Sequence, residues 1–242
     1  MKYLRVILLV FVAIVASIGT QSISARRLND KLQNRPYADL RPWHLGFSFG
    51  THTQDLSFSH NGFVTENGET WFMEQPSFSP GFNVTGLFSV RLNDYFSVRL
   101  TPGMYFGNKV VKMIDTTNGA TEKQNVKTSY VVIPADIKFA SLRYRNVRPY
   151  VTAGAMAVFD VAKKRSDFIK TKVTDYYLTL GFGCDFYLPF FKFIPEVKFC
   201  FGLSDVLEHD RPDLVDDPGK LKYTQSLKKV TSQMVVFSFY FE

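Results

Sequence analysis

The chain has 242 residues, a length that suits one domain, and 29 Lys and Arg against 22 Asp and Glu give it a formal net charge of +7 at pH 7. The positive charge does not indicate a nucleic-acid-binding protein, because the basic residues are spread along the chain without a nucleic-acid-binding motif. Phe, Tyr and Trp make up 16% of the residues, which is high for a soluble protein.

The first 22 residues have the pattern of a secretory signal peptide. Lys2 and Arg5 precede an apolar run over residues 6–15, and small and polar residues follow it. The run is shorter than the roughly 20 apolar residues that a membrane-spanning helix needs. We therefore expect cleavage after residue 19, 22 or 25, then a short periplasmic segment up to residue 42, and one membrane domain over residues 43–242.

From residue 43 onward, apolar and polar residues alternate with a period of two in about eight segments. Leu45, Phe47 and Phe49 show this pattern in the first segment. A period of two is typical of β-strands that expose one apolar face. The segments expected to be strands cover residues 43–52, 82–92, 96–107, 130–139, 150–160, 176–186, 191–203 and 233–241.

The connections between these segments are alternately short and long. The short ones cover residues 92–95, 140–148 and 188–190, and the long ones cover residues 53–79, 108–127, 161–174 and 204–228. Closed outer-membrane barrels have tight periplasmic turns and long external loops. The sequence therefore predicts an all-β fold, an eight-stranded antiparallel up-and-down transmembrane β-barrel in the bacterial outer membrane, with both termini in the periplasm.

If the apolar faces meet lipid, the polar faces line the lumen, and six ionisable residues lie on them. These residues are Arg99, Asp136, Lys138, Asp185, Glu196 and Lys198. An eight-stranded barrel is only wide enough for its own side chains, and an unpaired buried charge is costly. We expect these charges to pair and to close the lumen, with Asp185 near Glu196 across the 188–190 turn. The alternative is that a perturbed carboxylate such as Glu196 acts in proton or metal chemistry.

The residue types that carry catalysis or bind metals are not arranged for either task in this sequence. The four His residues have no metal-ligand spacing and no nucleophile, base and oxyanion motif around them. Cys184 and Cys200 fall on opposite faces of one hairpin, so we expect two free thiols rather than a disulfide. The sequence thus predicts no enzyme, no catalytic residue, no metal and no cofactor.

The short connection over residues 143–148 is rich in Arg and contains a Tyr, the residue types that favour protein interfaces. Its candidate contact residues are Arg143, Tyr144, Arg145 and Arg148. The connection over residues 204–228, which runs from acidic to basic, is the second candidate. Ordinary solvated charge remains the alternative for either one.

Several segments together resemble the PorT family, outer-membrane barrels of Bacteroidetes that are associated with the type IX (Por) secretion system. The resemblance covers nearly the whole region after the leader. It rests on residues 43–50, 79–84, 90–93, 129–134, 148–154, 183–199 and 238–242, including an Asp-Phe-Tyr-Leu-Pro run at 185–189. Asp136 departs from it, since an apolar residue is expected after the Ile-Pro pair at 133–134.

The resemblance implies a role in the assembly or operation of protein export, with partners in the secretion machinery and outer-membrane lipid around the barrel. It supplies no catalytic residues. The alternative is a small-solute or lipid-binding transport barrel. Strand number separates the two, because ten or more strands would leave room for a channel.

Overall fold

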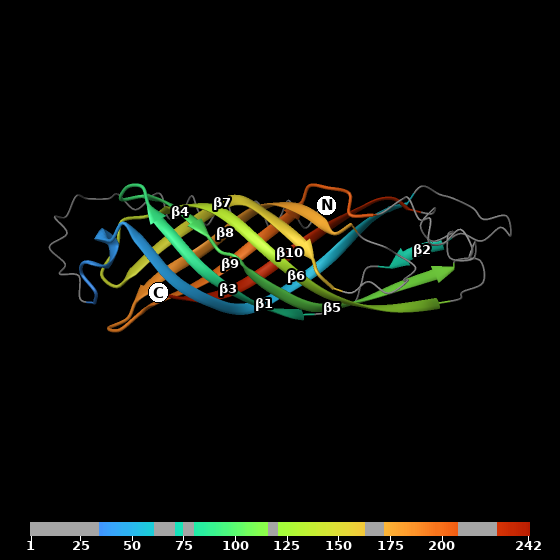
Figure 1. Ribbon diagram of the computed structural model, residues 1–242, viewed down its shortest axis with the longest axis horizontal. Coiled ribbons are helices and arrows are strands. Elements are labelled where there is room, and N and C mark those ends of the chain that lie inside the picture. Colours follow the sequence, from blue (N-terminus) through green and yellow to red (C-terminus); the bar gives the residue numbers. More distant parts are fainter. Residues whose placement is uncertain (1–33, 61–70, 75–79, 116–120, 163–171, 208–226) are drawn as a thin grey trace, which may run out of the picture. The chain divides into compact units, whose positions relative to one another are not determined.

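The computed structural model of the protein describes residues 34–60, 71–74, 80–115, 121–162, 172–207 and 227–242 (Figure 1). The expected signal peptide, and the expected periplasmic segment as far as residue 33, lie outside these residues. No helix among the described residues is long and apolar enough to cross a membrane.

The described part of the chain forms one antiparallel sheet of ten strands, preceded by a short 3-10 helix, η1 (Ala38–Leu40). The strands are β1 (Trp43–His60), β2 (Trp71–Glu74), β3 (Pro80–Arg91), β4 (Phe96–Leu100), β5 (Gly103–Asp115), β6 (Thr121–Ala140), β7 (Val147–Asp160), β8 (Thr174–Tyr187), β9 (Lys192–Gly202) and β10 (Leu227–Phe241).

The sheet closes on itself, because β1 pairs with β10 along one edge and with β3 along the other. β4 and β5 occupy a single position in the wall, since both pair with β3 on one side and with β6 on the other. Pro102 interrupts them because it has no N–H to donate, although its carbonyl oxygen accepts a hydrogen bond from Gly86 N at 2.8 Å. Among the described strands, β2 pairs only with β5. The described residues therefore confirm the eight-stranded barrel.

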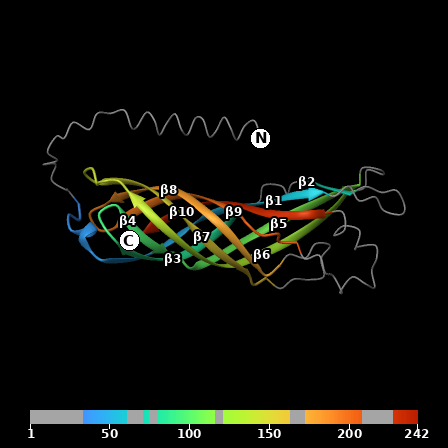
Figure 2. The same cartoon turned by 90° about the horizontal axis from the view of Figure 1, so that it is seen from above.

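The connections do not all have the lengths that the sequence predicts. The expected connection over residues 108–127 is mostly strand, because the β5–β6 ladder continues to the pair Ile114 and Thr121. β1 likewise extends to His60, and β10 already begins at Leu227. Backbone pairing extends the β5–β6 hairpin over residues such as 108–115, Asn-Lys-Val-Val-Lys-Met-Ile-Asp, in which apolar and polar residues do not strictly alternate, so the period of two does not reveal a strand there. In Figures 1 and 2, β2 and the end of the β5–β6 hairpin lie at the opposite end of the barrel from η1.

The two faces of the wall differ as the alternation predicts. Inward-facing side chains such as Ser48 and Val132 are fully buried. Outward-facing side chains are large, apolar and exposed, and aromatic rings stack across neighbouring strands, as Phe47 does on Phe241 with ring centroids 5.5 Å apart. A wall that is apolar outside and polar inside is the pattern of outer-membrane barrels.

The interior divides into layers along the barrel. The short connections over residues 92–95, 141–146 and 188–191 lie at one end, which we call the short-turn end. Nearest to it, Leu87, Tyr150 and Tyr240 pack around the charged residues described below. Further along lies an apolar layer that includes Tyr105, Met156 and Met234. Leu56, Val206, Leu207 and Val230 form the last layer.

Candidate functional site

The six ionisable residues that the sequence places in the lumen all lie there, and each is at most 7% exposed. They come from β4, β6, β8 and β9. The period of two brings them together, since residues two apart on a strand share a face. They form ion pairs with one another, which we describe in turn.

Glu196 is at the centre of the network. Arg99 Nη1 donates a hydrogen bond to Glu196 Oε2 at 2.7 Å, and the Tyr150 hydroxyl donates to the same oxygen at 2.7 Å. Lys198 Nζ lies 3.5 Å from Glu196 Oε1. The Tyr240 hydroxyl also donates to Glu196 Oε1 at 3.4 Å, so one carboxylate is shared between two cations and two phenols, an arrangement that compensates for its burial.

The other two carboxylates each have a lysine partner. Lys198 Nζ lies 2.5 Å from Asp136 Oδ2, and the Thr179 hydroxyl donates to Asp136 Oδ1 at 2.7 Å. Lys138 Nζ donates to both oxygens of Asp185 at 2.8 Å. Asp136, the residue that departs from the PorT pattern, is therefore a full member of the network.

The expected register of the β8–β9 hairpin is wrong by two residues. Gly183, and not Asp185, lies opposite Glu196. The expected pair of Asp185 with Glu196 implies a turn centred between residues 190 and 191, whereas the turn over residues 188–191 is centred between residues 189 and 190. The glycine has a packing reason, because a Cβ atom there would lie 2.3 Å from the Tyr150 hydroxyl oxygen.

Sequence reasoning missed two tyrosines that belong to the network, Tyr150 and Tyr240. The Tyr240 ring lies under the Arg99 guanidinium at 4.8 Å, and the Tyr150 ring lies 3.9 Å from Lys138 Nζ. Aromatic faces stabilise cations at such distances. Both tyrosines lie on the polar face of the alternation, and this signal could have identified them.

A second group of charges lies at the short-turn end. Glu242 Oε1 is 2.6 Å from His44 Nδ1 and 2.7 Å from Lys192 Nζ. Burial alone would raise the pKa of the Glu242 carboxyl. The contact with His44 and the charge of Lys192 outweigh burial and lower this pKa to about 2. Glu242 thus joins the strand that it follows, β10, to β1 and β9.

Residues 34–41, which we call the N-terminal strap, are attached to the short-turn end by polar contacts. Asp39 accepts a hydrogen bond from the Tyr187 hydroxyl and pairs with Arg148 at 3.2 Å and Arg143 at 3.7 Å. Asn34 Nδ2 donates to the Tyr187 carbonyl oxygen at 2.9 Å.

Because of these contacts, the four residues expected to bind a partner fall into two pairs, one engaged in the barrel and one exposed. Arg143 and Arg148 are engaged within the barrel, where Arg143 also lies over the Tyr187 ring at 3.6 Å. Tyr144 and Arg145 are exposed. Much of the second candidate, the connection over residues 204–228, lies outside the described residues.

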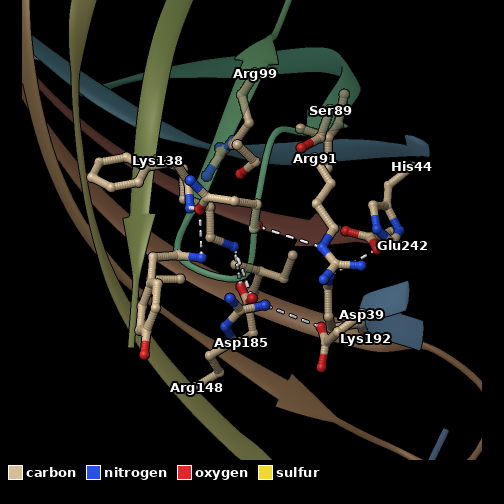
Figure 3. Close-up of a pocket in the computed structure, with 17 residues that line it drawn as sticks. Asp39, His44, Ser89, Arg91, Arg99, Lys138, Arg148, Asp185, Lys192 and Glu242 are labelled. Atoms are coloured by element: carbon tan, nitrogen blue, oxygen red, sulfur yellow. Dashed lines mark hydrogen bonds and ion pairs between the residues drawn. The ribbon is translucent and has the colours of Figure 1, made fainter. Parts of the chain in front are cut away.

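The short-turn end contains a pocket between the strap and the charge network (Figure 3). Its wall includes Asp39, Arg91, Arg99, Lys138 and Glu242, so it links the two charged groups. No set of His, Cys, Asp and Glu side chains in the described part of the chain could hold a metal ion. Cys184 and Cys200 are free thiols, as predicted. The charged groups can therefore fill and close the lumen.

Comparisons with known proteins agree with this architecture. Residues 30–208 match the family described as "Outer membrane protein beta-barrel domain". No curated protein matches the chain in sequence. Similar solved structures include the outer membrane protein OprG from Pseudomonas aeruginosa, which is 14% identical over 81% of this chain and 93% of its own, with a TM-score of 0.47.

Two further similar structures are those of the attachment invasion locus protein Ail of Yersinia pestis and Neisserial surface protein A. Ail is 14% identical over 84% of this chain and 100% of its own, with a TM-score of 0.37. The Neisserial protein is 12% identical over 83% of this chain and 98% of its own, also with a TM-score of 0.37. Because the family match covers most of the sequence, the chain belongs to the outer-membrane β-barrel proteins and resides in the lipid bilayer of the outer membrane.

Proposed function

We propose that the protein is a closed, non-enzymatic barrel that supports the assembly or operation of a type IX (Por) protein secretion system through its surfaces. The observation that carries this proposal is the filled lumen. Three cations and three carboxylates pair across it, and the strap is attached at its short-turn end. Such an interior favours a role in binding over a role in passage.

The secretion system is chosen because of the resemblance to the PorT family, which spans nearly all of the chain after the leader. In this proposal the short-turn end faces the periplasm, since outer-membrane barrels have their tight turns there. The long connections then face outward. Both termini lie in the periplasm, where the strap can meet other components of the machinery.

The proposed periplasmic contact includes two residues, Tyr144 and Arg145, rather than the four that the sequence indicates. Arg143 and Arg148 form ion pairs with Asp39, so we assign them to the attachment of the strap and not to the contact with a partner. Tyr144 is 55% exposed and Arg145 lies beside it, with its guanidinium 5.4 Å from the tyrosine ring. Tyr and Arg are the residue types that most often dominate binding at interfaces.

Deletion of the gene should leave cargo proteins trapped in the periplasm, and the measurement is immunoblotting of culture medium and periplasmic extract. Replacement of Tyr144 and Arg145 by Ala should cause a partial defect with normal barrel levels. The control is Phe190→Ser in the 188–191 turn, a residue that is 92% exposed and not part of the proposed contact. If the deletion strain secretes normally but loses uptake of a small solute, the alternative transport role replaces this one.

A further inference from the structure

The β3–β4 hairpin presents two arginines and two serines to the inside of the barrel near the short-turn end. Its register places Ser89 opposite Arg99, and Arg91 opposite Ser97. The four residues therefore occupy the corners of a square, with the two arginines at one pair of opposite corners and the two serines at the other pair. All four line the pocket at the short-turn end, and Figure 3 labels Ser89, Arg91 and Arg99 there. The register and the shared pocket thus bring two arginines and two serines to the wall of one cavity.

Arg99 has two donor atoms without a hydrogen-bond partner in the part of the chain that the structure describes. Its Nη1 donates to Glu196, whereas its Nε and Nη2 atoms are buried and have no hydrogen-bond partner among the residues that the structure describes. The Tyr240 ring meets the face of the guanidinium, 4.8 Å from its centre, and leaves the in-plane N–H groups unused. Buried donors are rarely left unpaired in folded proteins, because their desolvation is costly. An acceptor in the pocket would remove this cost.

The charges around the pocket favour an anionic acceptor. Three carboxylates lie in its wall, and each is already engaged: Asp39 with Arg148, Asp185 with Lys138, and Glu242 with Lys192. Five Lys and Arg residues line the same wall. Arg91 pairs with Asp94, whose side chain is 69% exposed, and exposed pairs of this kind are weak. Arg99 pairs with Glu196, so Arg91, whose pair is exposed and weak, is the cation of the wall whose charge is least compensated.

We propose that this pocket binds a phosphate group between Arg91 and Arg99, with Ser89 and Ser97 donating to its remaining oxygens. A tetrahedral oxyanion offers several acceptor oxygens, which suits two guanidinium forks and two hydroxyls better than the two oxygens of a carboxylate. The pocket lies at the short-turn end and is partly open to solvent, so the group can enter from the barrel end. The inference does not depend on the secretion role.

The phosphate group can belong to a free anion or to a phosphomonoester such as a headgroup. Both are tested by calorimetric titration of the full mature protein in dodecyl maltoside, a detergent without phosphate. Inorganic phosphate and glycerol 3-phosphate are titrated separately at constant ionic strength maintained with sodium chloride. We expect saturable binding of one equivalent. Tighter binding of inorganic phosphate identifies the free anion, and tighter binding of glycerol 3-phosphate identifies the headgroup type.

Variants test whether these four side chains are responsible for the binding of phosphate. Arg91→Gln and the double variant Ser89→Ala/Ser97→Ala should each weaken binding by about tenfold or more, because each removes hydrogen bonds to a charged group. Arg99→Lys keeps a cation beside Glu196 but removes the free fork, and it should weaken binding similarly. The control is Arg145→Gln, which removes one positive charge outside the pocket and should change affinity less than about twofold.

Two results would overturn the inference. One is the absence of a saturable signal for both ligands in the wild-type protein. The other is an equal loss of affinity in Arg145→Gln and Arg91→Gln, which would show general attraction of anions instead of a site. Arg91→Gln removes a side chain whose partner is an exposed aspartate, so the test does not depend on whether the Arg99 variant folds.

Discussion

Glu196 and Asp185 are both buried carboxylates, but they differ in how many groups depend on them. Glu196 accepts hydrogen bonds from Arg99 and Tyr150 and lies near Lys198, whereas Asp185 pairs with Lys138 alone in the network. Loss of the Glu196 charge leaves Arg99 without its ion pair inside the barrel. An uncompensated buried charge is more costly than the loss of a surface contact.

Glu196→Gln should therefore lower the free energy of unfolding by about 3–5 kcal/mol, although the side chain keeps its size. The measurement is urea unfolding of the protein refolded into lipid vesicles. The matched control is Asp94→Asn, which breaks the exposed pair with Arg91 and should cost less than about 1 kcal/mol. A loss below 1 kcal/mol for Glu196→Gln would mean that the network does not hold the barrel together.

Glu242 should make the stability of the short-turn end depend on pH. Its pKa in the folded protein, about 2, lies below the ordinary value of 4.5. The ionised carboxylate therefore stabilises the fold above about pH 4.5, and this contribution is lost as the pH falls towards 2. Glu242→Gln should cost up to about 3 kcal/mol at neutral pH.

Unfolding curves of the wild type and of Glu242→Gln, recorded at several pH values, check this expectation. The difference between the two proteins should shrink as the medium becomes more acidic. The subtraction cancels the titration of other carboxylates. A difference that stays constant with pH would show that the pair with Lys192 and His44 does not lower the pKa of Glu242.

At the scale of elements, the strap depends on one carboxylate. Asp39 joins η1 to Arg143, Arg148 and Tyr187, and the remaining strap contacts are individual hydrogen bonds such as that of Arg35 Nη1 to the Glu242 carbonyl oxygen at 2.9 Å. Local opening of such a segment costs less free energy than global unfolding. Its exchange behaviour should therefore respond to Asp39 independently of the barrel.

Asp39→Asn should speed hydrogen–deuterium exchange at the amides of Ala38, Leu40 and Arg41 by about tenfold, the effect of losing about 1.4 kcal/mol. These amides hydrogen-bond within the strap itself, to Arg35, Tyr37 and Ala38. Mass spectrometry of peptic peptides gives the rates, and peptides from β8 and β9 should be unchanged. Equal exchange in both proteins would show that Asp39 does not anchor the strap.

The outer faces of β1 and β10 form an aromatic surface in which Phe49 stacks on Phe241 with centroids 5.4 Å apart. Phe49→Arg should cost about 2–4 kcal/mol in lipid vesicles, because a cation on the lipid-facing side must leave water. The control is Phe190→Arg in the 188–191 turn, which should cost less than about 1 kcal/mol. Equal costs at both positions would mean that Phe49 does not face lipid.

For the whole molecule, the fold could be predicted because lipid imposes one rule on every strand. Residues such as Leu45 and Phe47 must face outward, so the period of two also assigns Arg99 and Glu196 to the lumen. The β5–β6 extension could not be predicted in this way, because its backbone pairs continue over residues that do not strictly alternate between apolar and polar types.

The details of the site depend on information that alternation does not contain. The turn over residues 188–191 is itself apolar, Leu-Pro-Phe-Phe, so the alternation does not show where the turn is centred, and the register is misjudged by two residues although the end of β8 is predicted to within one. The strap meets residues more than a hundred positions away, such as Arg148. Contacts at that separation follow from the closure of the barrel, and no local pattern indicates them.

The central claim is that the lumen is closed by its own side chains. Recording of ionic current through planar lipid bilayers that contain the full mature protein tests this claim most directly. We expect no conductance steps above the baseline of protein-free bilayers, because paired charges and apolar layers fill the interior. Large and stable channels that appear with the wild-type protein would contradict the account.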